Sequence, residues 1–174
     1  MVLDKFESVK DGFEGFKSKI SGKIKEEHNK RIGLLVDGPN MLRKEFDFDL
    51  NDVKKELEKI GVVKIGDVFL NQYAPEKLIE AVVNQGFHPR IVTSDDIDAP
   101  MATEAMEAIF NPHIDIIALM TRDADFQYVL LKAKKYGKET IVIGTEPFAS
   151  ALRNTADNLI ILKPNKKSEV LSKV

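Results

Sequence analysis

The chain has 174 residues, of which 43% are apolar and 31% charged, which suffices for one well-buried core and is short for two. It contains no cysteine, which excludes disulfides, thiolate metal sites and a cysteine nucleophile. With 26 basic and 28 acidic residues, the net charge of −2 provides no global attraction to nucleic acid or anionic lipid, so a nucleic-acid partner requires a local basic patch. No apolar run approaches the roughly 20 residues that span a bilayer, and the N-terminus is charged where a signal peptide is apolar. We therefore expect a cytoplasmic protein without membrane contact.

Residues 1–30 predict an amphipathic helical extension. Apolar residues recur there at steps of three and four, at Leu3, Phe6, Val9, Phe13, Phe16, Ile20 and Ile24. Three glycines lower the intrinsic stability of such a helix, so its apolar face requires packing, either against the rest of the chain or against a partner such as a second copy. The polar face mixes acids with lysines, which argues against a membrane surface.

Residues 31–163 alternate short apolar runs with helical patterns, which is typical of an α/β domain with a mainly parallel sheet. The expected strands are 32–36, 62–73, 90–93, 114–120, 140–144 and, at the edge, 159–162. The expected helices are 49–59, 75–86, 100–110, 123–137 and 147–155. Residues 164–174 predict a mobile basic tail.

Acidic residues follow the two most apolar strands. Asp37 comes directly after the first strand, and Asp123 and Asp125 follow the fourth. In an open parallel sheet, functional groups gather beyond the carboxyl ends of the strands, where the strand order reverses. If these two strands are neighbours there, the carboxylates converge, and like charges at short range require a cation among them. Carboxylate oxygens without His or Cys favour magnesium or manganese over zinc.

Each of these acids also has a purely structural explanation. Asp37 with Gly38 is typical of a turn, Asp123 of a helix N-cap, and Asp125 of an acid in the first helical turn. We favour the metal site because both buried strands deliver acids at the same end.

The helix expected over 100–110 and the loop before it contribute further acids. Glu104 lies at the edge of the apolar stripe of this helix, whereas Glu107 lies on the far side and is expected in solvent. Asp95, Asp96 and Asp98 crowd the preceding loop. They either complement the helix N-terminus or open toward the same end of the sheet.

The sequence lacks the motifs of several other kinds of functional site. His28, His88 and His113 are not paired at metal-ligand spacing. The sequence contains no G-x-G-x-x-G after a strand, no G-x-x-x-x-G-K-[ST] and no G-x-S-x-G. These absences argue against dinucleotide binding, P-loop nucleotide binding and a serine hydrolase.

Three segments together match a known family pattern. D-G-P-N at 37–40 matches D-G-x-N, T-R-D-A-D-F at 121–126 matches [ST]-x-D-x-D-F, and residues 137–144 with Ala156 and Asp157 match a later segment. On these residues, from about Gly33 to Leu162, the sequence resembles the NYN domain, a branch of the PIN-like ribonuclease superfamily. It is also similar to a mostly archaeal group with the same T-R-D-A-D-F form and an N-terminal extension.

One motif departs from the family. Its middle motif is K-x-x-D followed six residues later by an acid, and Asp98 with Glu104 fits the second half. Asp95 stands where the family has the lysine, so a phosphate contact is missing.

The resemblance implies a Rossmann-like three-layer sandwich with a mainly parallel five- or six-stranded sheet in the order 3-2-1-4-5. It implies a divalent-metal-dependent ribonuclease with Mg²⁺ or Mn²⁺, in which water attacks the phosphodiester bond of RNA. The catalytic, metal-binding carboxylates would be Asp37, Glu104, Asp123 and Asp125, with Asp98 as a further metal ligand. Asn40 and Thr121 would hydrogen-bond the carboxylates, a water or the scissile phosphate. Apart from the resemblance, the sequence places Arg43, Lys44 and Arg122 beside the expected pocket and Arg153 on the helix after the fifth strand, which predicts a modest local basic rim.

Two other functions remain open at this point. A catalytically weak or inactive RNA-binding or assembly module is favoured by Asp95 at the lysine position. A phosphoryl acceptor at Asp37 also fits an acid after a central strand, but no lysine follows a late strand in the place usual for such sites, and the pair Asp123 and Asp125 fits that reading less well.

Overall fold

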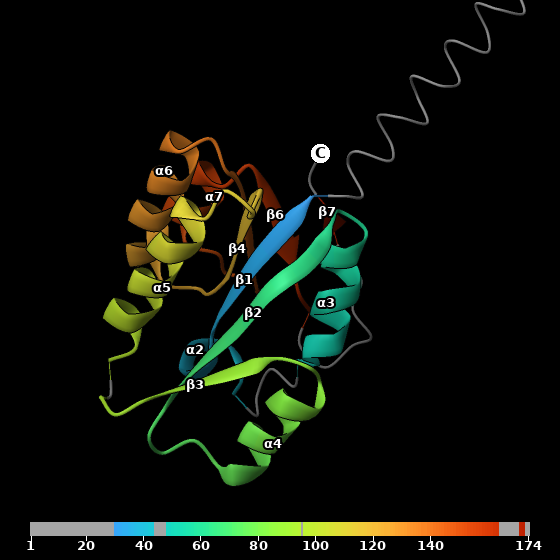
Figure 1. Ribbon diagram of the computed structural model, residues 1–174, viewed down its shortest axis with the longest axis vertical. Helices are drawn as coiled ribbons and strands as arrows, with labels where there is room; N and C mark the ends of the chain where they lie inside the picture. The colour runs from blue at the N-terminus through green and yellow to red at the C-terminus, as the bar shows by residue number, and fades with distance from the viewer. Residues whose placement is uncertain (1–29, 44–47, 95, 164–170, 173–174) are drawn as a thin grey trace, which may run out of the picture.

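The computed structural model describes residues 30–43, 48–94, 96–163 and 171–172, which form an α/β domain with helices on both faces of one sheet (Figure 1). The strands are β1 (Arg31–Asp37), β2 (Val62–Asn71), β3 (His88–Val92), β4 (Ile116–Met120), β5 (Glu139–Gly144), β6 (Asn158–Ile161) and β7 (Leu171–Ser172). The helices are α2 (Gly38–Met41), α3 (Leu50–Glu58), α4 (Glu76–Asn84), α5 (Asp98–Phe110), α6 (Gln127–Lys135) and α7 (Ser150–Thr155), with a 3₁₀ turn η1 (Ala124–Phe126). The predicted N-terminal helix lies outside the described residues.

The strand order is β3-β2-β1-β4-β5-β6-β7, and every neighbouring pair is parallel except β6 with β7. The expected mainly parallel sheet and the order 3-2-1-4-5 are confirmed, and β6 adds the sixth strand beside β5. Strand β7 falls within the segment predicted as a tail, whose other residues lie outside the described ones. Successive strands build outward from β1 in one direction and from β4 in the other, so the order reverses between these two strands.

The apolar strands are buried because helices cover both faces of the sheet. Alternate side chains of β1 point to opposite faces. Ile32, Leu34 and Val36 pack with α3 and α4, whereas Leu35 packs with α5, α6 and α7. Figure 1 shows α5 and α6 on one side of the sheet and α3 on the other. Burial on both faces explains why β1 and β4 read as continuous apolar runs.

The structure corrects some predicted boundaries. A short helix, α2, follows β1, where the sequence suggested only a turn, and Asp37 is its N-cap. Helix α5 begins at Asp98 rather than at residue 100, because a proline is tolerated in the first turn, where backbone N–H groups have no helical partner. Helix α7 begins at Ser150, after Pro147 rather than at it. Among the helices of the described ranges, none has the length and apolarity to cross a membrane.

Candidate functional site

The carboxyl ends of β1 and β4 lie side by side at the reversal of strand order. Val36 is paired with Met120 in the parallel register, so the residues that follow them, Asp37 and Thr121, leave the sheet next to each other. This is the edge at which an open α/β sheet places its functional groups.

The carboxylate of Asp37 is fully buried and held by three hydrogen bonds. Its Oδ2 atom accepts from Thr121 Oγ1 at 2.9 Å and from Asn40 Nδ2 at 2.7 Å, and its Oδ1 atom accepts from the Asn40 backbone N–H at 3.2 Å. Thr121 Oγ1 in turn accepts from the Asp123 backbone N–H at 3.1 Å. The motif residues Asn40 and Thr121 therefore fix the orientation of Asp37 and tie it to the segment that carries Asp123.

The pKa values of Asp37 and Asp98 are both raised at this edge. Burial raises the pKa of Asp37, the hydrogen bonds from Asn40 and Thr121 oppose that rise, and the charge of Asp123 adds to it. Burial also raises the pKa of Asp98, and the charges of Asp123, Asp96, Asp37 and Asp125 raise it further. The tertiary structure therefore brings Asp98 into the field of the acids that follow β1 and β4.

Asp123 and Asp125 also have the structural roles that their positions suggested. The Asp123 carboxylate accepts from the Asp125 backbone N–H at 2.9 Å and caps η1. Asp98 is the first-turn acid of α5, and its N–H donates to Asp96 Oδ1 at 2.8 Å. These backbone contacts position the acids without excluding a ligand, because each carboxylate oxygen can accept more than one hydrogen bond or metal contact.

Glu104 is held elsewhere. Arg90 Nη2 donates to Glu104 Oε1 at 2.9 Å and lies 3.5 Å from Asp67 Oδ2, and Asp67 also contacts His88 Nδ1 at 3.0 Å. These four side chains line a depression of about 540 Å³ on the β2 and β3 side of α5. The structure thus pairs Glu104 with β3, and not with the acids that surround Asp98. This cluster was not predicted from the sequence; the feature that could have indicated it is Asp67, an acid within an apolar strand.

A cavity of about 420 Å³ adjoins the acidic edge. Its walls include Asn40, Arg43, Arg122, Asp123 and Phe148, so the two predicted basic residues flank it. Arg43 is anchored by donation from Nε to the Pro39 carbonyl at 2.7 Å. Phe148, from the loop before α7, also forms part of the wall, and the sequence motifs did not predict this contribution.

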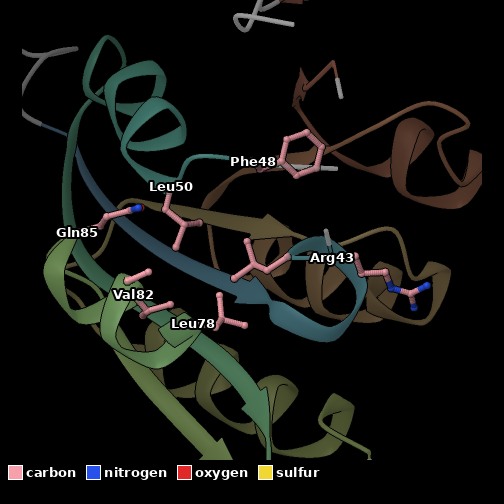
Figure 2. A pocket seen from close by; sticks show the side chains of 8 residues that line it. Arg43, Phe48, Leu50, Leu78, Val82 and Gln85 are labelled. Carbon is pink, nitrogen blue, oxygen red and sulfur yellow. The ribbon is translucent and has the colours of Figure 1, made fainter. Parts of the chain in front are cut away.

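Figure 2 shows a second hollow, of about 190 Å³, on the α3 and α4 side of Arg43. Leu50, Leu78 and Val82 surround it, and the guanidinium of Arg43 points away from these apolar side chains. Arg43 therefore lies between the two spaces, with its guanidinium directed away from the apolar side chains of this hollow.

The oxygen atoms at the acidic edge are of the kind that a hard divalent cation prefers as ligands. The groups are carboxylates with amide and hydroxyl neighbours, and a cation would relieve the repulsion that adds to burial in raising the pKa of Asp98. In the part of the chain that the structure describes, no three His, Cys, Asp or Glu side chains are already arranged as a metal cage. Binding would therefore require side-chain rotation, which the partly exposed Asp123 and the exposed Asp125 permit.

Comparison with known proteins places these motifs in a family context. The NYN domain model matches residues 31–163. The uncharacterised protein MJ0482 of Methanocaldococcus jannaschii is 52% identical over 164 residues, which cover 92% of this chain and 67% of that protein. A crystal structure of VPA0982, a protein of unknown function from Vibrio parahaemolyticus, matches with a TM-score of 0.68 at 21% identity, over 83% of this chain and 98% of that one. That structural match supports the fold alone.

Proposed function

Because the chain belongs to the NYN domain family, we propose that it is a divalent-metal-dependent ribonuclease that hydrolyses phosphodiester bonds of RNA. The observation that supports the proposal is the link through Thr121, whose hydroxyl donates to the buried carboxylate of Asp37 and accepts from the backbone N–H of Asp123. Asp123 lines a cavity that has Arg43 and Arg122 in its wall.

The proposed metal-binding residues are Asp37, Asp98, Asp123 and Asp125. When bound, Mg²⁺ or Mn²⁺ lowers the pKa of a water and stabilises the negative charge that develops on the phosphate. Asn40 and Thr121 serve this site by keeping both oxygens of Asp37 in one orientation. Glu104 joins it only if the ion pair with Arg90 opens.

Arg43 and Arg122 are proposed to bind phosphate groups of the RNA. Both line the cavity beside Asp123, and a guanidinium matches the geometry of phosphate oxygens. No protein nucleophile is needed, because water is the attacking group, and this suits a chain without cysteine.

The alternative is a catalytically weak or inactive RNA-binding module. Two observations favour it: the acid Asp95 at the family's lysine position, and the ion pair that holds Glu104 to Arg90. Under this alternative the acidic edge would be retained without turnover.

The test is cleavage of end-labelled single-stranded and hairpin RNA with Mn²⁺, Mg²⁺ or EDTA. We expect metal-dependent cutting that falls on the order of a hundredfold in Asp37→Asn and in Asp123→Asn. The exposed Glu107→Gln provides a matched loss of one acid on α5 and should cut like wild type. Tight RNA binding by folded wild-type protein that cuts no substrate with either metal would establish the binding module instead.

A further inference from the structure

Exposed apolar side chains gather on one helix. Eight large apolar side chains are exposed in the described residues, and four of them lie on α6, just after it, or at the end of α5. These four are Phe110 (54% exposed), Tyr128 (76%), Leu131 (49%) and Tyr136 (49%). Figure 1 shows α5 and α6 side by side on the same face of the sheet. Scattered exposed apolar residues require no explanation, but a cluster of this kind indicates a binding surface.

The exposed residues of α6 share one face with two lysines. At about 100° per residue, Tyr128, Leu131, Lys132, Lys135 and Tyr136 fall within an arc of about 140°. Val129, Leu130 and Ala133 fill the buried side. Of the five residues in the arc, Lys132 is half-buried and the other four are exposed; we call these five residues, together with Phe110, the α6 face.

The rings of this face are held in defined positions. Phe110 and Tyr136 form an edge-to-face pair with centroids 4.9 Å apart, and Lys132 Nζ lies 5.4 Å from the Tyr136 centroid. Tyr128, three quarters exposed, offers the largest open ring surface of the cluster. Rings interleaved with cations are what unpaired nucleotides bind, because bases stack on the rings and phosphates attract the lysines.

The α6 face begins at the acidic edge. Asp123 caps η1, η1 runs directly into α6, and Tyr128 comes three residues after Asp125. From Tyr128 to Tyr136 the helix rises about 12 Å, the length of three to four stacked nucleotides at about 3.4 Å each. An RNA strand with a phosphate at the acids is therefore able to continue along this helix.

We propose that the α6 face is a binding track for single-stranded RNA that leads away from the acidic edge. The proposal rests on the proposed function for its choice of RNA, but not for the existence of the track. A second copy of the chain fits this face less well. A dimer contact over this face would bury Lys132 and Lys135 in the interface, and lysine is depleted in interface cores.

The track is tested by binding, with cleavage suppressed by EDTA. The full chain is titrated against a fluorescein-labelled single-stranded RNA of about 12 nucleotides, with anisotropy as the readout. Tyr128→Ala should raise the Kd about fivefold or more, and Tyr128→Phe, which keeps the ring, should stay within about twofold. The double variant Lys132→Gln, Lys135→Gln should flatten the slope of log K against log salt by about 1.4, or about 0.7 for each lysine.

Matched controls lie on α4, in the other helical layer. Val83→Ala removes an exposed apolar side chain of similar exposure to Leu131, and Lys77→Gln removes an exposed lysine. Both should leave the Kd unchanged. Equal Kd and salt slope in the wild type, Tyr128→Ala and the double lysine variant would overturn the track, as would the absence of RNA binding by wild type.

Two further outcomes separate this inference from its alternatives. A shift of Tyr128→Ala from dimer to monomer by light scattering, with unchanged RNA affinity, would overturn the track in favour of a second copy. Protein that binds RNA through Tyr128 but cuts none with either metal would contradict the nuclease and support the track.

Discussion

The hydroxyl of Thr121 donates a hydrogen bond of 2.9 Å to the buried carboxylate of Asp37, across 84 residues of sequence. The same oxygen accepts from the Asp123 backbone N–H at 3.1 Å. One side chain therefore links the acid after β1 to the acid after β4, and it fixes their relative position.

Thr121→Val should weaken both activity and folding. Valine keeps the shape of threonine but leaves Asp37 with one donor fewer and the Asp123 N–H without its acceptor. We expect the unfolding free energy to fall by about 1–3 kcal/mol, measured by urea denaturation, and RNA cleavage to fall about tenfold or more. Thr121→Ser retains the hydroxyl and should recover most of both. Wild-type cleavage in Thr121→Val would show that this bond does not position the site.

Added Mn²⁺ should raise the melting temperature of the wild-type protein. A ligand present at about 100 times its Kd stabilises the folded state by about 2.7 kcal/mol. Asp98→Asn removes one of the coupled carboxylates and should lose most of this gain, whereas Glu107→Gln on the same helix should keep it. Differential scanning fluorimetry with and without EDTA is the measurement. An equal shift in both variants would place the ion away from Asp98.

Glu104→Gln should cost far less activity than Asp123→Asn. Glu104 is paired with Arg90 at 2.9 Å, so its loss should leave cleavage within about threefold of wild type. Arg90→Met should instead destabilise the fold by about 1–3 kcal/mol, because it removes a cation from the buried Asp67. Initial cleavage rates and urea midpoints distinguish the two effects. Loss of cleavage in Glu104→Gln comparable to that in Asp123→Asn would establish Glu104 as a metal ligand.

Acid should weaken the fold through Asp115. The hydrogen bond from Arg31 lowers the pKa of Asp115 to about 2, from an ordinary value of 3.8. A depressed folded-state pKa contributes stability above the unfolded value, and that stability is lost as the pH falls from about 3.8 to about 2. Asp115→Asn should therefore lower the urea midpoint at pH 7. Its difference from wild type should shrink as the pH falls through this range and vanish below about pH 2, and a difference that stays constant with pH would contradict this assignment.

Gly38→Ala should displace the backbone next to Asp37 and so disturb the site. A Cβ at this position would lie 2.6 Å from Leu70 Cδ2 and closer still to the carbonyl oxygen of Phe69, a backbone atom that cannot move aside. We expect a loss of about 1–3 kcal/mol in unfolding free energy and a fall in cleavage, because Asp37 precedes this residue. Gly33→Ala is the control. Its Cβ would meet only ordinary contacts at 3.5 Å or more, so it should fold and cut like wild type.

The sequence by itself determined the sheet and the position of the acids along it. Strands β1 and β4 were predicted because residues buried on both faces must be apolar, and that requirement is visible in any short window. The acids after those strands were predicted to converge because parallel strands end at a common edge. The order 3-2-1-4-5 came from the family resemblance, since local patterns do not specify which strands become neighbours.

Only the tertiary structure decided which side chains meet. Glu104 lay at the rim of an apolar stripe in the sequence, but its partner is Arg90 of β3, 14 residues earlier in the chain, whose Nη2 lies 2.9 Å from Glu104 Oε1. Asp98 is likewise coupled to Asp123, because α5 begins at the edge where β4 ends. The exposure of Tyr128 also could not be predicted from the sequence, because a tyrosine in an amphipathic helix can equally well pack against the core. Contacts between distant segments depend on strand order and helix rotation, and these are set by the packing of the whole core rather than by any local pattern.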